Sequence, residues 1–282
     1  MVHQLRTISR TFDGSRVPVV QVVATDLDGT LLRSDGAVSA RTRAALHAVQ
    51  REGRWVVLAT GRPIRFVHRL AADLGGQGPV ICANGAVVYD AARDRVVEER
   101  ALRPTTTREV IAALRAQEPD LAFAWETTRE FRCEPGFAAL AEWPVPDGAV
   151  LDESVRDTHD GVVKLLARHP AGDMSSMFDG LAAQVDGLAT VTHSTATLVE
   201  VSAAGVDKGT AVAQFVAERG FAPEHTIAFG DMPNDLALLD WAGWSVAVAN
   251  AHPLVRARAD TMTASNDEDG VALVLEGLPR GP

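Results

Sequence analysis

The segment Val19-Val20-Gln21-Val22-Val23-Ala24-Thr25-Asp26-Leu27-Asp28-Gly29-Thr30 is the most informative part of this sequence. Residues 19–25 are mostly apolar and β-branched, which is typical of a strand buried on both faces inside a parallel sheet. Asp26 and Asp28 follow this strand, and residues two apart in an extended chain point the same way. Carboxylates held that close repel each other unless a cation lies between them. A plain polar turn is the alternative, because Asp and Gly are common turn residues.

The composition predicts a globular protein with a sizeable core. The chain has 282 residues, 46% of them hydrophobic, and can form one large domain or two. Its net charge of −10 argues against nucleic acid or an anionic membrane as a partner. Cys82 and Cys133 are the only cysteines, which fits a reducing cytoplasm and excludes a disulfide framework. No apolar stretch approaches the roughly 20 residues of a membrane span.

Lysine is scarce in this chain, since Lys164 and Lys208 are its only lysines and every other basic residue is an arginine. A position that keeps lysine against this bias can require a compact, flexible ammonium group. Chance is the alternative explanation.

Strand and helix patterns alternate at both ends of the chain. After the first strand, the patterns predict a helix at 39–52 capped by Ser39, a strand at 54–59, a helix at 63–74, a strand at 79–83 and a hairpin at 86–89 and 95–99. The alternation returns with a helix at 208–219, a strand at 225–229, a helix at 233–239 and a strand at 244–248. This order predicts an α/β fold with a doubly wound, Rossmann-like parallel sheet covered on both faces.

The middle of the chain has a different pattern, with short strands at 121–125, 162–166 and 197–201 and helices near 107–117 and 173–185. Such a mixture predicts an inserted α+β domain. We therefore divide the chain into a polar leader at 1–18, a core at 19–88 and 204–282, and an insert at 89–203. The leader has no apolar segment of the secretory type, and we assign it no function.

Four polar clusters fall at the carboxyl ends of predicted core strands, where open parallel sheets bind ligands. Asp26, Asp28 and Thr30 form the first. The second is Thr60-Gly61-Arg62, where a hydroxyl and a glycine before a helix suit a bound anion, although an ordinary turn explains them too.

The third cluster is Asp207-Lys208-Gly209, in which Asp207 is expected to cap a helix. A lysine at a helix N-terminus opposes the helix dipole, so Lys208 is a candidate to neutralise a phosphate and the paired carboxylates. The fourth is Gly230-Asp231-Met232-Pro233-Asn234-Asp235. Helix capping explains one of its two acids, and the clustered carboxylates favour a hard cation such as Mg²⁺.

In order and spacing, these clusters resemble the four motifs of the haloacid dehalogenase-like phosphatase superfamily. The insert resembles the large α/β cap of the Cof-type subfamily, known as type IIB. Asn84-Gly85-Ala86 and Ala249-Asn250-Ala251 resemble accessory segments of that subfamily.

The resemblance implies a mechanism and a role for each motif residue. Asp26 would attack phosphorus and form an aspartyl-phosphate, and Asp28 would protonate the leaving alcohol and then activate water. Mg²⁺ would be held by the side chains of Asp26 and Asp231 and by the backbone carbonyl of Asp28. Phosphate binding is expected from Thr60, Gly61, Lys208 and Asn234, and supporting roles from Thr30, Arg62 and Asp235.

The resemblance thus implies a cytoplasmic, Mg²⁺-dependent phosphatase for small phosphorylated metabolites such as sugar phosphates or nucleotide-type cofactors. A phosphosugar mutase and a non-catalytic phosphometabolite-binding protein are the alternatives.

Other residues remain open at this point. Lys164 lies in a predicted cap strand and is either structural or at the edge of a substrate pocket. The histidines show no metal-binding spacing, and the aromatic residues of the insert either line a pocket or fill a core. These residues are His159, His193, His225, His252, Trp125, Phe131 and Trp143. Cys82 is expected to be buried.

Overall fold

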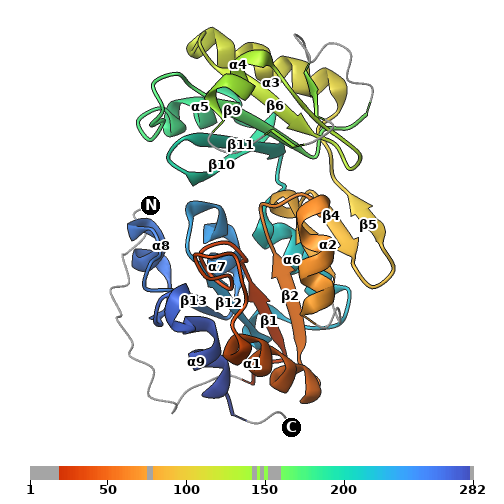
Figure 1. The fold of residues 1–282 in the computed structure, drawn as a ribbon, viewed down its shortest axis with the longest axis vertical. Coiled ribbons are helices and arrows are strands. Elements are labelled where there is room, and N and C mark those ends of the chain that lie inside the picture. Colours follow the sequence, from red (N-terminus) through yellow and green to blue (C-terminus); the bar gives the residue numbers. More distant parts are fainter. Residues whose placement is uncertain (1–18, 75–78, 142–144, 147–148, 152–159, 280–282) are drawn as a thin grey trace.

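The computed structural model describes residues 19–74, 79–141, 145–146, 149–151 and 160–279. The predicted leader at 1–18 lies outside these residues, as do Trp143 and His159. Two sheets organise the described residues, one above the other in Figure 1.

The eight-stranded sheet is the predicted α/β core, with the order β14-β13-β12-β1-β2-β3-β4-β5. Neighbouring strands from β14 to β3 pair in parallel, whereas the pairs β3–β4 and β4–β5 are antiparallel. Its strands are β1 (Val22–Thr25), β2 (Trp55–Ala59), β3 (Val80–Cys82), β4 (Val87–Asp90), β5 (Arg95–Glu99), β12 (Thr226–Gly230), β13 (Trp244–Ala247) and β14 (Thr261–Met262). Because β5 pairs with β4, the chain leaves this sheet after Glu99, whereas the sequence placed the start of the insert at residue 89.

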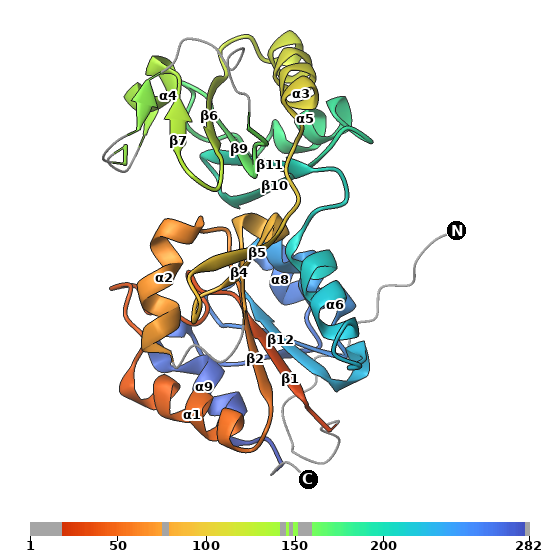
Figure 2. The same ribbon diagram turned by 90° about the vertical axis from the view of Figure 1, so that its right-hand side faces the viewer.

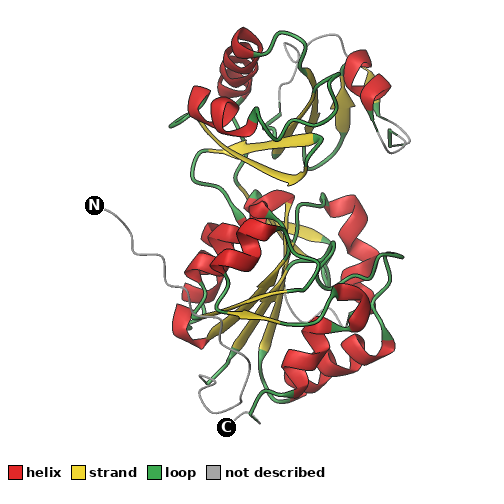
Figure 3. Ribbon diagram, turned by 90° about the vertical axis from the view of Figure 1, so that its left-hand side faces the viewer, coloured by secondary structure: helices red, strands yellow, loops and turns green. Residues whose placement is uncertain are grey.

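Helices cover both faces of this sheet, as Figures 2 and 3 show. Successive strand residues point to opposite faces, so Val23 packs on one side and Val22 and Ala24 on the other. The first side is covered by α1 (Ala40–Arg51), α2 (Ile64–Asp73) and α9 (Gly270–Glu276), the second by α6 (Lys208–Ala217), α7 (Leu236–Trp241) and α8 (Pro253–Arg258). Ser39 caps α1 as predicted, accepting a 3.0 Å hydrogen bond from the Thr42 backbone N–H.

The order of strands reverses at β1. The chain runs from β1 through β2 to β3 on one side, and later places β12, β13 and β14 on the other. In doubly wound sheets, ligands bind beyond the carboxyl ends of the strands at such a switch point. Asp26 follows β1 and Asp231 follows the neighbouring β12, so the fold brings these carboxylates to one crevice.

The six-stranded sheet lies in the insert, with the order β10-β11-β9-β6-β7-β8. Its strands are β6 (Ala122–Glu126), β7 (Phe131–Cys133), β8 (Val150–Leu151), β9 (Lys164–Arg168), β10 (Ala189–Thr195) and β11 (Leu198–Ala203). One face packs under α3 (Pro104–Gln117) and α5 (Phe178–Gln184), with Phe123, Leu165 and Val199 fully buried there. The shorter α4 (Pro135–Leu140) packs on the other face near Phe131. We call the six-stranded sheet, together with α3, α4 and α5, the cap.

The cap departs from its predicted elements in detail. Residues 173–174 are irregular and 175–177 form a turn, so α5 begins only at Phe178. The predicted strand at 162–166 is shifted to Lys164–Arg168, because Val162 instead bridges Leu102 in the segment that enters the cap. Trp125 and Cys82 are fully buried; burial was predicted for Cys82, and Trp125 fills the cap core.

Candidate active site

Asp26 lies directly after β1, and its backbone N–H donates to the Phe229 carbonyl of β12 at 3.1 Å. Its carboxylate is buried, and Oδ1 accepts a 2.6 Å hydrogen bond from Nζ of Lys208. Burial raises the pKa of Asp26 above its usual range, while Lys208 acts in the opposite direction.

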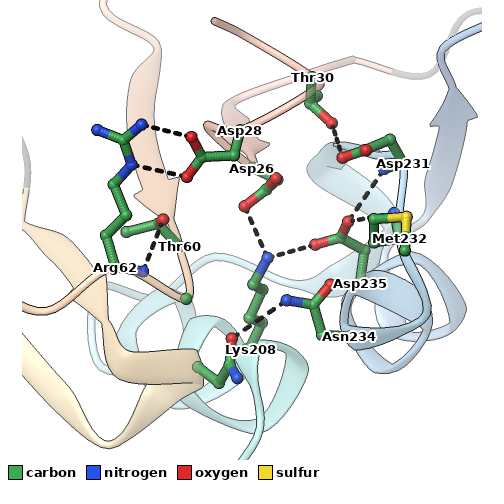
Figure 4. Close-up of polar contacts among 12 residues, drawn as sticks. Asp26, Asp28, Thr30, Thr60, Arg62, Lys208, Asp231, Met232, Asn234 and Asp235 are labelled. Carbon is green, nitrogen blue, oxygen red and sulfur yellow. Dashed lines mark hydrogen bonds and ion pairs between the residues drawn. The ribbon is translucent and has the colours of Figure 1, made fainter. Parts of the chain in front are cut away.

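Lys208 is the first residue of α6 and is almost completely buried. Its ammonium donates to Oδ1 of Asp26 at 2.6 Å and to Oδ1 of Asp235 at 2.7 Å, as Figure 4 shows. Burial alone would lower the pKa of Lys208, but Asp235 and Asp26 outweigh it and raise that pKa, so the side chain stays a cation. Asp207 caps the helix as predicted, accepting from the Thr210 backbone N–H at 2.7 Å. Lys208 opposes the helix dipole at the N-terminus of α6, and its ion pairs with the two buried carboxylates of Asp26 and Asp235 explain why a lysine lies there.

Both carboxylate oxygens of Asp235 accept hydrogen bonds from neighbouring residues of the site. Its Oδ1 accepts from Lys208, and its Oδ2 accepts from the backbone N–H groups of Asp231 and Met232, each at 3.0 Å. The carboxylate therefore fixes both the lysine and the loop that follows β12.

The Asp231 side chain contacts Thr30 and Gly29, in the segment that follows β1. Oγ1 of Thr30 donates to Oδ1 of Asp231 at 2.7 Å. Gly29 has a φ of +73°, and a Cβ added there would lie 2.4 Å from Oδ2 of Asp231. Only glycine combines this left-handed backbone with so close an approach of the carboxylate. The Gly29 carbonyl is held in turn by Nδ2 of Asn250 at 2.7 Å.

Asp28 occupies a different environment from Asp26. The chain turns after Thr25 and does not stay extended, and the Asp28 side chain is 53% exposed, against 6% for Asp26. Its carboxylate accepts from both the Nε and the terminal nitrogen of Arg62, the first at 2.7 Å. The backbone N–H of Arg62 donates to Oγ1 of the fully buried Thr60 at 3.1 Å.

The carboxylates of Asp26, Asp231 and Asp235 offer ligand atoms within 4.8 Å of one another. Both oxygens of Asp235 already accept hydrogen bonds, which leaves Asp26 and Asp231 to bind a cation. Burial, followed by the charge of Asp235, raises the pKa of Asp231 to about 7. Buried carboxylates that resist ionisation in this way fit a hard divalent cation, which would replace their protons. No histidine joins a metal-ligand group within the described part of the chain.

A cavity of about 1120 Å³ separates this cluster from the cap. Its lining includes predicted site residues, namely Asp26, Asp28, Gly61, Arg62, Asp231 and Asn234. Thr60, Lys208, Asp235 and Thr30 lie behind this lining and contact it through hydrogen bonds.

Polar contacts across the cavity join the cap to the core. Lys164 of β9 donates to the Gly61 carbonyl at 2.8 Å and forms an ion pair with Glu200 of β11. Glu200 also accepts from Nδ2 of Asn84 at 2.8 Å, and Asn84 accepts from Asn234 at 3.3 Å. Burial alone would raise the pKa of Glu200, but Lys164 and Asn84 lower it. Lys164 thus has a structural role between cap and core and also lines the cavity, while its contact with a substrate stays a prediction. Sequence reasoning missed Glu200, for which it had no signal.

Comparison with known proteins identifies the family. A family model of haloacid dehalogenase-like hydrolases matches residues 23–275. A 5-amino-6-(5-phospho-D-ribitylamino)uracil phosphatase of Bacillus subtilis is 30% identical over 257 residues, which cover 91% of this chain and 94% of that protein. A pyridoxal phosphate phosphatase of Escherichia coli is 27% identical over 276 residues, covering 89% of this chain and 96% of that protein. A solved haloacid dehalogenase-like hydrolase of B. subtilis is 25% identical, with a TM-score of 0.78 and coverage of 92% of this chain and 100% of that one.

The chain belongs to the haloacid dehalogenase-like hydrolases. This confirms the predicted Cof-type membership, the prediction of an enzyme and the predicted fold class, in which a second sheet accompanies a parallel-sheet core. Within the described ranges, no helix combines the length and apolarity needed to span a membrane.

Proposed function

We propose that this protein is a Mg²⁺-dependent phosphatase that hydrolyses small phosphorylated metabolites through an aspartyl-phosphate on Asp26. The observation that supports this most is the buried Asp26–Lys208–Asp235 chain, which lies beside Asp231 at the bottom of a cavity. Relatives named for hydrolysis of an aminouracil phosphate and of pyridoxal phosphate support the same reaction type.

In this proposal Asp26 is the nucleophile. Lys208 holds its Oδ1, which leaves Oδ2 to attack phosphorus. The ammonium reduces the repulsion between a carboxylate and an anionic phosphate, and Asp235 keeps the ammonium in place.

Asp26 and Asp231 are the side chains that would hold Mg²⁺, with the backbone carbonyl of Asp28 as a further expected ligand. When bound, the ion would neutralise phosphoryl charge and orient the phosphate for attack. Thr30 and Gly29 set the position of the Asp231 carboxylate.

Phosphate oxygens would be held by groups in the lining of the cavity and directly behind it. The Thr60 hydroxyl accepts from the Arg62 backbone, so its own proton is free to be donated. Gly61 and Asn234 line the cavity beside it. Lys208 then acts mainly through Asp26, because both of its resolved bonds go to carboxylates.

Asp28 is proposed as the general acid and base. Its carboxylate lines the cavity and is exposed enough to reach a leaving group. Because Arg62 now binds both of its oxygens, Asp28 must exchange this ion pair for the leaving oxygen during turnover.

The test is release of inorganic phosphate from p-nitrophenyl phosphate, with and without Mg²⁺. Turnover should require the metal and disappear in Asp26→Asn, whereas the exposed Asp186→Asn should keep it. Activity that survives EDTA or the loss of Asp26 contradicts the mechanism. Interconversion of hexose 1- and 6-phosphates without phosphate release would favour a mutase, and Mg²⁺-dependent binding without turnover a binding protein. Location in the cytoplasm stays a prediction.

A further inference from the structure

We propose that the cavity selects phosphomonoesters whose leaving group carries no charge of its own and presents an apolar surface to the cap. This inference rests on the proposed phosphatase function and names the substrate class for the same site. It follows from how the charged and apolar side chains of the cavity wall are arranged.

The first observation is that the charges on the cap side of the cavity cancel within the protein. Glu126 of β6 binds the guanidinium of Arg65 through both of its oxygens, and its side chain is only 3% exposed. Lys164 and Glu200 form the second pair, with side chains 7% and 3% exposed. The remaining cation of the described lining, Arg62, is bound to Asp28.

Each cation of the lining that the structure describes thus already has a carboxylate partner, and a distal anion of a substrate would find none unpaired there. A second phosphate or a carboxylate entering the cavity would lose its hydration and would have to compete with Glu126 or Glu200 for a partner. Glu126 itself is almost completely buried, and burial raises its pKa even beside Arg65, so an anion placed next to it would be poorly hydrated. A charged leaving group is therefore disfavoured there.

The second observation is the apolar surface beside the Arg65–Glu126 pair. Phe66 is 50% exposed although it lines the cavity, and Phe131 lies on the cap side of it. The Arg65 guanidinium lies 4.6 Å from the Phe66 ring centroid and 5.5 Å from that of Phe131. Leu166 and Leu198 extend this surface along the cap sheet. An apolar ring on the leaving group would cover Phe66, which is otherwise half exposed to water, and would lie against the more deeply buried apolar side chains of the cap.

The experiment compares kcat/KM for benzyl phosphate, 4-carboxybenzyl phosphate and glycerol 3-phosphate with Mg²⁺ present. The first two differ by a distal carboxylate group, and the third has a small polar leaving group. We expect benzyl phosphate to be preferred over each of the others by about tenfold or more, as desolvation of an unpaired charge or loss of apolar burial implies. Equal values, or a preference for either competitor, would overturn the inference.

Two variants tie the selection to the cap pair. Glu126→Gln keeps the shape of the side chain but frees the Arg65 cation, so the preference for benzyl over 4-carboxybenzyl phosphate should shrink to near unity. Arg65→Met leaves Glu126 unpaired, and the preference should widen. Glu98→Gln is the control, because Glu98 near the end of β5 forms an ion pair with Arg100 outside this cavity. If the ratio of kcat/KM for benzyl phosphate to that for 4-carboxybenzyl phosphate is unchanged in both variants, the Arg65–Glu126 pair does not determine the selection.

The inference and the function on which it rests fail in different ways. If p-nitrophenyl phosphate releases no phosphate, both are wrong. If it does, and the benzyl and 4-carboxybenzyl esters react equally, the phosphatase stands and the selection by the cap wall is wrong.

Discussion

Replacing Gly29 by alanine should weaken Mg²⁺ binding far more than an equivalent change at another left-handed glycine. Gly29 has a φ of +73°, and a Cβ there would lie 2.4 Å from Oδ2 of Asp231. The backbone conformation alone costs an L-residue about 1–2 kcal/mol. To restore an ordinary contact of at least 3.4 Å, the carboxylate must move by about 1 Å, which would strain its 2.7 Å bond from Thr30.

Gly36 supplies the matched control. It has a φ of +79°, lies in an exposed turn, and has nothing within 4 Å of an added Cβ. Gly36→Ala should therefore lose the same backbone contribution to stability while leaving the carboxylate of Asp231 in place. Misplacing a group that supports a metal ligand typically lowers affinity by about 10–100-fold, and we expect this loss in Gly29→Ala alone.

The assay combines urea unfolding in EDTA with calorimetric titration of Mg²⁺ into both variants. Both variants should lose stability through the backbone, and Gly29→Ala should lose more because its Cβ also displaces the Asp231 carboxylate. Mg²⁺ affinity in Gly36→Ala should match that of the unmodified protein. If Gly29→Ala binds Mg²⁺ as tightly as Gly36→Ala, the assignment of Asp231 as a ligand is refuted.

The remaining predictions concern charge. Burial and Asp235 raise the pKa of Asp231 to about 7, above its unfolded value, so the metal-free protein should gain stability as the pH falls from 8 to 6. Mg²⁺ affinity should decrease over the same range, because the ion must displace a proton. Thermal unfolding of the metal-free protein and calorimetric titration of Mg²⁺ across this range check the two effects. Lys208→Met leaves two buried carboxylates without a cation and should lower the free energy of unfolding by about 3–5 kcal/mol in EDTA, measured with urea. Glu200→Gln leaves Lys164 uncompensated, and hydrogen exchange should accelerate in β9 and β11 but not in β12.

The core could be predicted because its determinants are local. The β-branched run before Asp26 specifies a buried strand, and parallel strands end at a common edge, so clusters far apart in the sequence had to meet there. The same reasoning was too simple for Asp28. It assumed an extended chain, whereas a turn separates the two aspartates into a buried group and an exposed one.

The cap was harder to predict because its defining contacts join distant residues. Glu126 pairs with Arg65 and Glu200 with Lys164, and neither pair has a characteristic spacing along the chain. The strand β7 was also missed, since its three residues are too few to show a clear period. The seven-residue β10 was missed too, and its side chains are only partly buried or exposed, so it lacks the apolar run that marks a buried strand. Only the rarity of lysine pointed toward Lys164.

The burial of every lysine and cysteine has a practical consequence for covalent labelling. Counted as whole residues, Lys164 and Lys208 are 5% and 1% exposed, and Cys82 and Cys133 are inaccessible. Burial also raises the pKa of the Cys82 thiol, which keeps it protonated and unreactive. Amine- and thiol-directed reagents therefore find no side-chain target on the described surface, and immobilisation or dye attachment needs an introduced cysteine. By the same logic, acylation of Lys164 would report moments when the cap lifts from the Gly61 carbonyl.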